Sequence, residues 1–170
     1  MNSNLRAIPT LGFNEALREA WSKLTVFKGR SRRSEFWWTY LALFIVNIVL
    51  SFIPVIGSLC SFVLALAFIP LTFRRLHDTG RSGWWFGGGC LLGIIFIAVM
   101  VYQVISLAAG MDSVPSENEV TGMMIALFTT PSVLFCLLAV LCYEIVMLVF
   151  FCQDSEPNAN QYGESPKYVL

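Results

Sequence analysis

Charged side chains are scarce in this sequence. Only 13% of its 170 residues are Asp, Glu, Lys or Arg, whereas 56% are hydrophobic. A soluble domain carries about 25% charged residues, so the composition excludes an ordinary soluble domain and favours a membrane protein. Its eleven Lys and Arg residues balance its eleven Asp and Glu residues. This zero net charge gives no indication of a nucleic-acid partner.

Metal-binding and catalytic patterns are also missing. The chain has a single histidine, His77, and its cysteines form no CxxC pair, which excludes a thiolate zinc site and a multi-histidine phosphohydrolase site. An Asp-Thr-Gly triplet occurs once, at residues 78–80, whereas aspartic proteases need two. We therefore expect no metal, no cofactor and no catalytic residue. The five cysteines lie within or beside apolar runs and are expected to be small packing residues: Cys60, Cys90, Cys136, Cys142 and Cys152.

Long apolar runs fill the middle of the chain. Residues 36–73 form one run nearly twice as long, as a helix, as a bilayer core of about 30 Å is thick. Pro54 and Gly57 favour a break, predicting helices over about Phe36–Ile53 and Val55–Phe73. Further spans are predicted at about Trp84–Ala109 and Pro131–Cys152. Residues 123–130 form either a short segment at the outer interface or the start of one kinked helix.

The predicted fold is an all-α polytopic membrane protein with four transmembrane helices in two antiparallel hairpins. Residues 1–35 form a cytoplasmic segment, residues 36–152 the membrane domain and residues 153–170 a polar cytoplasmic tail that we expect to lie in water. The sequence GFNEALREAWSKLTVF predicts an amphipathic helix before the first span. This helix either lies flat on the inner leaflet, which we favour, or docks on the ends of the spans. No cleavable signal peptide is evident, so Met1 is expected to be the mature N-terminus.

The cations predict the orientation. All eleven lie in the N-terminal segment, in the loop between the second and third spans, or in the tail, and an even number of spans puts these three places on one side. The linker GMDSVPSENEVTG, which includes Asp112, has no cation. Since Lys and Arg resist translocation, both termini are predicted to be cytoplasmic.

Two arginine-rich stretches are the candidate sites. The first, RRLHDTGRSGWW at residues 74–85, is either an anchoring turn or a grip for an anionic ligand such as a lipid headgroup; catalysis by His77 lacks a second base or nucleophile. The second, FKGRSRRSEFWW at residues 27–38, has the same pattern: it is either a positive-inside anchor alone, or its Glu35 also pairs with an arginine of the first stretch. The candidate lipid or ligand residues are Arg30, Arg32, Arg33, Arg74, Arg75, His77, Asp78 and Arg81, and the interface anchors are Trp37, Trp38, Trp84 and Trp85.

Polar residues inside the predicted spans are few. Glu144 is the ionisable residue inside the fourth span, where we expect it to pair with an arginine of the 74–85 stretch; a proton relay and snorkelling to the interface are the alternatives. Asn47 and Gln103 are expected to form hydrogen bonds between helices, and the glycines of residues 83–93 predict close helix packing within the bundle or between copies.

The two stretches, the apolar hairpin between them and NANQYGESP in the tail together resemble the domain of unknown function 805 family, the YhaH/YhaI-like bacterial inner-membrane proteins. The resemblance implies a small multi-span inner-membrane protein and supplies no catalytic residue. We expect a non-enzymatic binding or accessory protein whose cationic cytoplasmic face engages anionic lipid or a partner. The partner is either another membrane protein or a second copy of the chain. The alternatives are a small oligomeric transporter or channel that uses Glu144, and a membrane enzyme that acts on a lipid or phosphate substrate.

Overall fold

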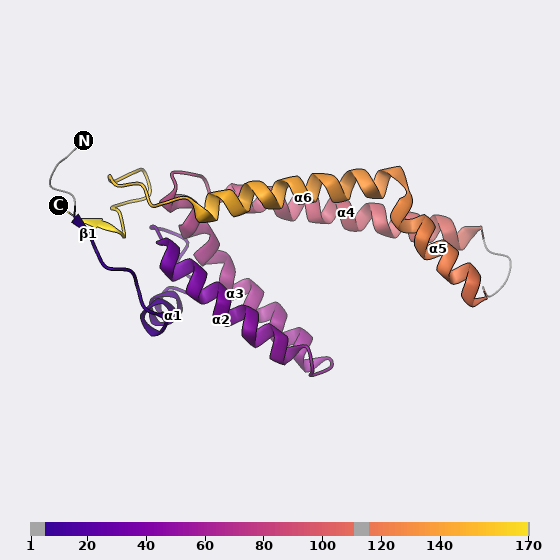
Figure 1. Ribbon diagram of the computed structural model, residues 1–170, viewed down its shortest axis with the longest axis horizontal. Helices are drawn as coiled ribbons and strands as arrows, with labels where there is room; N and C mark the ends of the chain where they lie inside the picture. Colours follow the sequence, from indigo (N-terminus) through magenta and orange to yellow (C-terminus); the bar gives the residue numbers. More distant parts are fainter. Residues whose placement is uncertain (1–5, 111–115, 170) are drawn as a thin grey trace. The chain divides into compact units, whose positions relative to one another are not determined.

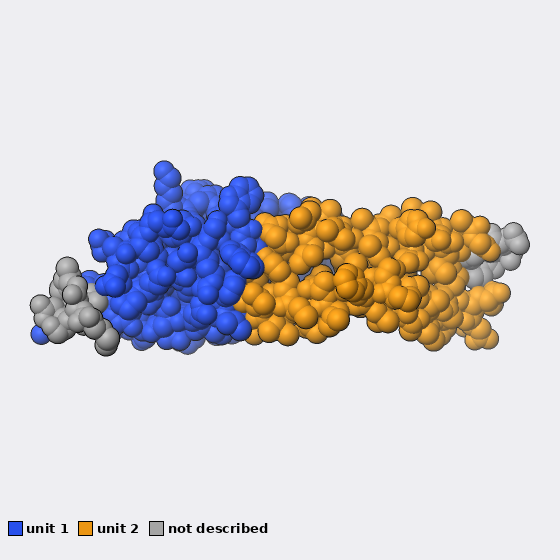
Figure 2. All heavy atoms as spheres, turned by 90° about the horizontal axis from the view of Figure 1, so that it is seen from above, with its two compact units in different colours: residues 1–86, 149–170 blue, residues 87–148 orange. Residues whose placement is uncertain are grey.

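The computed structural model describes residues 6–110 and 116–169, and their regular structure consists of helices and two short strands, joined by loops and followed by an irregular tail (Figure 1). Met1 and Asp112, both part of predictions from the sequence, lie outside these ranges. The chain forms two compact units, residues 1–86 with 149–170 and residues 87–148 (Figure 2). Its elements in chain order are β1 (Arg6–Ala7), α1 (Phe13–Ser22), α2 (Arg33–Leu50), α3 (Ile56–Asp78), α4 (Trp84–Ala109), α5 (Glu117–Thr129), α6 (Pro131–Cys152) and β2 (Tyr168–Val169).

Three helices of the described chain, α3, α4 and α6, are long and apolar enough to cross a membrane. The sequence predicted four such spans. The helix α2 is not among the three, because it includes Arg33 and Glu35 in its first turn and Asn47 near its end. Its position in the chain nevertheless matches the first predicted span, since it ends at Leu50.

The second predicted span ends later than expected. We predicted its end at Phe73, but α3 continues to Asp78, so Arg74, Arg75 and His77 belong to a helix and not to a loop. The additional turn is stabilised by an ion pair between Arg75 and Asp78, three residues apart and buried. The loop that follows is short, because α4 begins at Trp84 as predicted.

The helices α2 and α3 form an antiparallel hairpin (Figure 1). The break falls at residues 51–55, where Pro54 and Gly57 predicted it. Val55 adopts a positive φ of 61°, and a Cβ on Gly57 would collide with the carbonyl of Leu50. Gly57 is therefore required for the close approach of the two helices.

The amphipathic helix α1 packs on this hairpin. Its buried face consists of two small residues, Ala16 and Ala20, and Ala20 contacts Phe36 of α2 and Leu71 of α3. The structure therefore has the docked arrangement and not the flat one that we favoured. Trp21, the residue after Ala20 on α1, is 73% exposed.

In the second unit, α4 and α6 run side by side (Figure 1). A Cβ on Gly88 or Gly89 would lie within 3.1 Å of the Tyr143 ring or hydroxyl, which confirms that glycines of α4 allow close packing within the bundle. Gln103 donates a hydrogen bond to Ser132 of α6 at 2.9 Å, as predicted between helices. The segment that precedes α6 is a separate helix, α5. It begins after a capping box formed by Ser116 and Glu119, and it ends before Pro131, the first residue of α6.

Two predictions about side chains in the apolar helices are wrong. Asn47 donates to the Leu43 carbonyl of its own helix at 2.8 Å and not to another helix. The five cysteines are free thiols, and all except the half-exposed Cys136 lie on the exposed surface, so they do not fill the interior. Outward-facing apolar side chains are ordinary in a helix that contacts lipid, and hydropathy alone does not separate them from interior ones.

Candidate functional site

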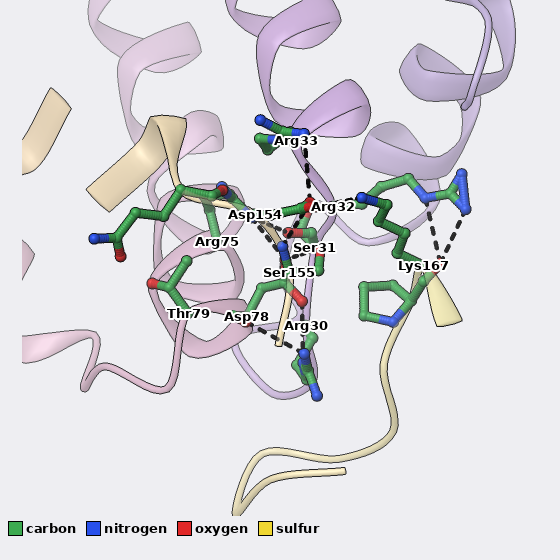
Figure 3. Close-up of polar contacts among 12 residues, drawn as sticks. Arg30, Ser31, Arg32, Arg33, Arg75, Asp78, Thr79, Asp154, Ser155 and Lys167 are labelled. Atoms are coloured by element: carbon green, nitrogen blue, oxygen red, sulfur yellow. Dashed lines mark hydrogen bonds and ion pairs between the residues drawn. The ribbon is translucent and has the colours of Figure 1, made fainter. Parts of the chain in front are cut away.

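The two arginine-rich stretches and the tail meet in one buried polar cluster, which we call the arginine knot: Arg30, Arg32, Arg74 and Arg75 with Glu35 and Asp78. Figure 3 shows Arg30, Arg32, Arg75 and Asp78 of this cluster together with Ser155 of the tail. All of it belongs to the first unit. Each of these side chains was singled out from the sequence, and each is at least nine-tenths buried. The structure therefore brings these predicted residues together.

Asp78 is the centre of the knot. Its carboxylate is fully buried and accepts hydrogen bonds from Arg30 Nε at 3.0 Å, Arg75 Nη1 at 2.6 Å and the Ser155 hydroxyl at 2.6 Å. A buried carboxylate requires such partners, because charge removed from water is costly unless it is paired and hydrogen-bonded. Asp78 thus holds two arginines at once.

Arg30 joins the helix α3 to the tail. Its Nη1 donates to the carbonyls of Asn158 and Gly163 at 2.8 and 3.2 Å, and its Nη2 donates to those of Asp78 and Glu156 at 3.2 and 2.6 Å. With the bond from Nε to Asp78, all five donors of the guanidinium are used. No donor of Arg30 is left for an outside ligand.

Arg75 closes the end of α6. The last carbonyls of a helix have no partner within it, and Arg75 donates to two of those nearby, Phe151 O at 3.0 Å and Gln153 O. Arg33 supplies a further donor to Cys152 O at 3.2 Å. Cations at this end of a helix also oppose the negative end of its dipole. These arginines therefore fix the point where the chain leaves α6.

Arg74 joins α1, α2 and α3. Its Nη2 pairs with Glu35 at 3.1 Å, as the sequence predicted for Glu35, and its Nη1 donates to the carbonyls of Lys23 and Val26, each at 2.7 Å. The Nε atom of Arg74 is also buried, and it has no hydrogen-bond partner in the described chain.

Arg32 joins the two ends of the described chain. It donates to the Pro166 carbonyl at 3.0 Å and to the Pro9 carbonyl. Beside it, β1 and β2 pair antiparallel with Ala7 opposite Tyr168. The segment before α1 and the tail are therefore held against each other.

The tail was expected to lie free in water, and this expectation is wrong. Ser155 and Ser165 are buried, the Glu156 amide donates to the Asp78 carbonyl at 3.1 Å, and the Asn160 amide donates to the His77 carbonyl at 3.0 Å. The tail packs through carbonyls and hydroxyls that satisfy arginine donors, so its polarity does not prevent packing. The polar composition of the tail predicts exposure to water, so it did not reveal that these residues are buried. The NANQYGESP motif was the sequence signal that could have identified the packed tail.

His77 takes part in a structural contact. Its ring stacks on Tyr162 with centroids 3.8 Å apart and planes within 5°, and its Nδ1 lies 3.2 Å from the Gly29 carbonyl. These contacts tie α3 to the tail and to the loop before α2. Among the described residues, no carboxylate, thiol or hydroxyl is recorded in hydrogen-bonding distance of the imidazole, as acid–base or nucleophilic chemistry requires.

Asp154, Arg33 and Lys167 form an exposed edge of the knot (Figure 3). Partial burial acts to raise the pKa of Asp154, but the Lys167 ammonium, the Ser155 amide and Arg33 outweigh it and hold the pKa below its usual value. The hydrogen bond to Asp154 raises the pKa of Lys167. Arg81 lies nearby, with its guanidinium 3.8 Å from the Phe150 ring and a bond of 2.6 Å to Gln153.

The four predicted tryptophan anchors differ in exposure. Trp84 is 81% exposed, whereas Trp37 is half-buried beside the core around Phe36. Trp38 donates to the Leu11 carbonyl at 3.2 Å, and Trp85 makes an edge contact with Phe150. The tryptophans thus combine packing with exposed ring surface, which suits the membrane–water interface.

Glu144 lies on the exposed side of α6, in the second unit. None of the ion pairs in the described chain includes it. The arginines expected to reach it donate elsewhere, Arg74 to Glu35, Arg75 to Asp78 and Arg81 to Gln153. Glu144 and these arginines belong to different units, so the pairing of Glu144 stays a prediction.

Similar proteins are known by sequence. A family model described as "Protein of unknown function (DUF805)" matches residues 24–164. Inner membrane protein YhaH of Escherichia coli (strain K12) is 36% identical over 105 residues, which cover 55% of this chain and 82% of YhaH. Inner membrane protein YhaI of the same strain is 27% identical over 150 residues, which cover 84% of this chain and 86% of YhaI. No solved structure matches the chain significantly.

Proposed function

Because this chain belongs to the DUF805 family of proteins of unknown function, we propose its role from the knot and its surroundings: a non-enzymatic inner-membrane protein whose polar end binds the anionic surface of the inner leaflet. The observation that carries this proposal is a division among the cations. The knot arginines donate to the chain itself, whereas Arg6, Arg18 and Lys28 are exposed and form no side-chain hydrogen bond or ion pair within the described residues. The exposed cations are the ones available to lipid phosphates.

Because of this division, the proposed lipid-binding surface does not consist of the arginines that were predicted to bind lipid. Arg30, Arg32, Arg74 and Arg75 are buried, so we assign them the role of holding the polar end rigid. Trp21 and Trp84 expose large rings in the same unit as these cations, and aromatic rings with nearby cations are typical of surfaces at headgroup depth.

Four membrane crossings with cytoplasmic termini belong to this proposal. The knot joins Arg30 before α2, Asp78 at the end of α3 and Ser155 after α6, so these points lie on the same side of a membrane. If α3 crosses, the antiparallel α2 must bring the chain across first, and its 18 residues span about 27 Å. The helices α4 and α6 then form the second pair of crossings, and the positive-inside rule assigns the knot to the cytoplasm.

The non-enzymatic part of the proposal is supported by the surroundings of His77. Its Nδ1 faces a backbone carbonyl, and one face of its ring stacks on Tyr162. A lone imidazole in this setting has a packing role and lacks the second group that a lipid- or phosphate-directed enzyme needs.

The experiment compares how strongly spin-labelled phosphatidylglycerol and phosphatidylcholine associate with the full chain in mixed vesicles. We expect about a fivefold preference for phosphatidylglycerol, since one cation near the surface contributes about 1 kcal/mol. The preference should fall at high salt and in Lys28→Gln. Equal association of the two lipids with the wild-type chain would overturn the proposed function.

A transporter is the second candidate, favoured by one observation: Glu144 is an exposed carboxylate in an apolar helix, and it has no ion pair among the residues that the structure describes. Such a group is costly in lipid unless a second copy or a transported cation pairs with it. Proton or cation flux in vesicles that Glu144→Gln abolishes would support this candidate, and equal flux in vesicles with and without the protein would remove it.

A further inference from the structure

A groove of about 450 Å³ lies between α1 and the hairpin of α2 and α3, all within the first unit. This volume falls in the range of about 300–1,000 Å³ that is usual for ligand sites. The walls are almost entirely apolar and include Leu17 and Trp21 of α1, Val46 of α2, and Leu64 and Phe68 of α3. An apolar ligand segment therefore has matching surface on three helices.

The groove runs along helices that cross or approach the membrane. On α2 its lining extends from Thr39 to Val46, about 10 Å, and on α3 from Leu64 to Arg74, about 15 Å. Arg74 belongs to the knot, so the groove leads from the polar end into the apolar part of the hairpin. A water-soluble anion would leave the apolar walls uncovered, whereas a lipid has both an apolar and a polar part.

The charged residues that line the groove are all cations: Arg18 of α1, Lys23 directly after α1, and Arg74. Arg18 is exposed and has no ion pair in the described chain, while Lys23 pairs with Glu19 on the same helix. Because α1 is docked on the hairpin, it places these two cations beside the groove. The charge favours an anionic group at this position.

Arg74 adds an independent indication of a ligand. Its side chain is only 2% exposed, and its Nε donor has no partner within the described residues. Buried donors in folded proteins almost always have a hydrogen-bond partner. Arg74 lines the groove, and a small rotation of its side chain would bring this donor to a ligand oxygen there.

We propose that the groove between α1 and the α2–α3 hairpin binds one anionic glycerophospholipid, with an acyl chain along the apolar walls and its phosphate or ester oxygens beside Arg18, Lys23 and Arg74. This inference rests on the proposed function and adds a discrete site to it. General attraction to a charged leaflet leaves lipids in rapid exchange, whereas a site that buries an acyl chain retains one molecule.

The test counts retained phosphatidylglycerol on the purified full chain by native mass spectrometry, after exchange into detergent and competition with phosphatidylcholine. The blocking variant is Ala67→Phe, because Ala67 lines the groove and the new ring would enter empty space. The matched control is Ala65→Phe, on the exposed surface of the same helix. The exposed Arg18→Gln removes a groove cation without removing any bond within the described chain.

We expect one retained phosphatidylglycerol in the wild type and in Ala65→Phe, and at least about a tenfold lower occupancy in Ala67→Phe. Arg18→Gln should lower the occupancy while circular dichroism shows an unchanged helix content. If Ala67→Phe does not fold, an unchanged occupancy in the folded Arg18→Gln overturns the proposal by itself.

Equal occupancy in Ala67→Phe and Ala65→Phe would also overturn the groove site. A preference for spin-labelled phosphatidylglycerol that persists in both variants would then show that the proposed function survives without the groove. Retained phosphatidylcholine in place of phosphatidylglycerol would contradict the assignment of an anionic headgroup.

Discussion

Replacing Asp78 with Asn should open the arginine knot. The substitution keeps the shape of the side chain but removes its charge, and it leaves Arg30 and Arg75 buried without their shared counter-ion. Breaking a buried pair by removing one partner costs about 3–5 kcal/mol. The two pairs share one carboxylate, so their costs do not simply add. Because a domain is stable by only about 5–15 kcal/mol, this loss should release the tail from α3.

The assay is amide hydrogen exchange in detergent micelles, read at Glu156, whose amide donates to the Asp78 carbonyl. Exchange at this amide should accelerate strongly in Asp78→Asn, while α4 within the second unit keeps its protection. The control is Asp154→Asn, since Asp154 is 44% exposed and its surface pairs contribute at most about 1 kcal/mol. Equal exchange in the two variants would refute the assignment of Asp78 as the centre of the knot.

Three further predictions concern the contacts of the tail. Gly80→Ala should destabilise the first unit by about 1–2 kcal/mol in chemical denaturation, because Gly80 has a φ of +71° and a Cβ there would collide with the Glu156 carboxylate; an unchanged midpoint would contradict this. Tyr162→Ala should lower the free energy of unfolding by about 0.5–1.5 kcal/mol through loss of the ring stack, whereas Tyr162→Phe keeps the ring and should be nearly as stable as the wild type. Equal losses in the two variants would show that the stack contributes nothing. Tail exchange, corrected for its intrinsic pH dependence, should be constant from about pH 7.5 to 9, which lies above the range in which a histidine such as His77, stacked on Tyr162, ordinarily titrates. The lowered pKa of Asp154 preserves its contribution until the pH falls below the ordinary 3.8, and the raised pKa of Lys167 preserves its contribution until the pH rises above the ordinary 10.5. Loosening of the tail between about pH 7.5 and 9 would contradict this.

Apolar periodicity and helix breakers were sufficient to predict most of the helices. The break near Pro54, the start of α4 at Trp84 and the start of α6 at Pro131 all follow from local chemistry, because proline and glycine change the backbone wherever they occur. The end of α3 does not follow from such signals. It depends on an ion pair between Arg75 and Asp78 that is stable because other segments bury it.

The sequence predicted which residues form the candidate site, but it did not predict their role. Charge complementarity was enough to expect a bond between Glu35 and an arginine of α3. The acceptors that satisfy Arg30 are mostly backbone carbonyls of the tail, such as those of Asn158 and Gly163, more than 120 residues away in sequence. Every residue has a carbonyl, so no side-chain pattern reveals which ones an arginine will use. The same limit concealed the buried tail and the groove beside α1.

The most direct test of the central claim, that the knot gathers three distant segments on one side of the membrane, is thiol accessibility with a membrane-impermeant reagent. Single cysteines would replace Thr10, Val55 or Glu164 in a chain without its natural cysteines, in right-side-out and inverted vesicles. The account predicts that Thr10→Cys and Glu164→Cys are labelled from the cytoplasmic side and Val55→Cys, in the turn between α2 and α3, from the opposite side. Labelling of Thr10→Cys and Glu164→Cys from different sides would contradict the account.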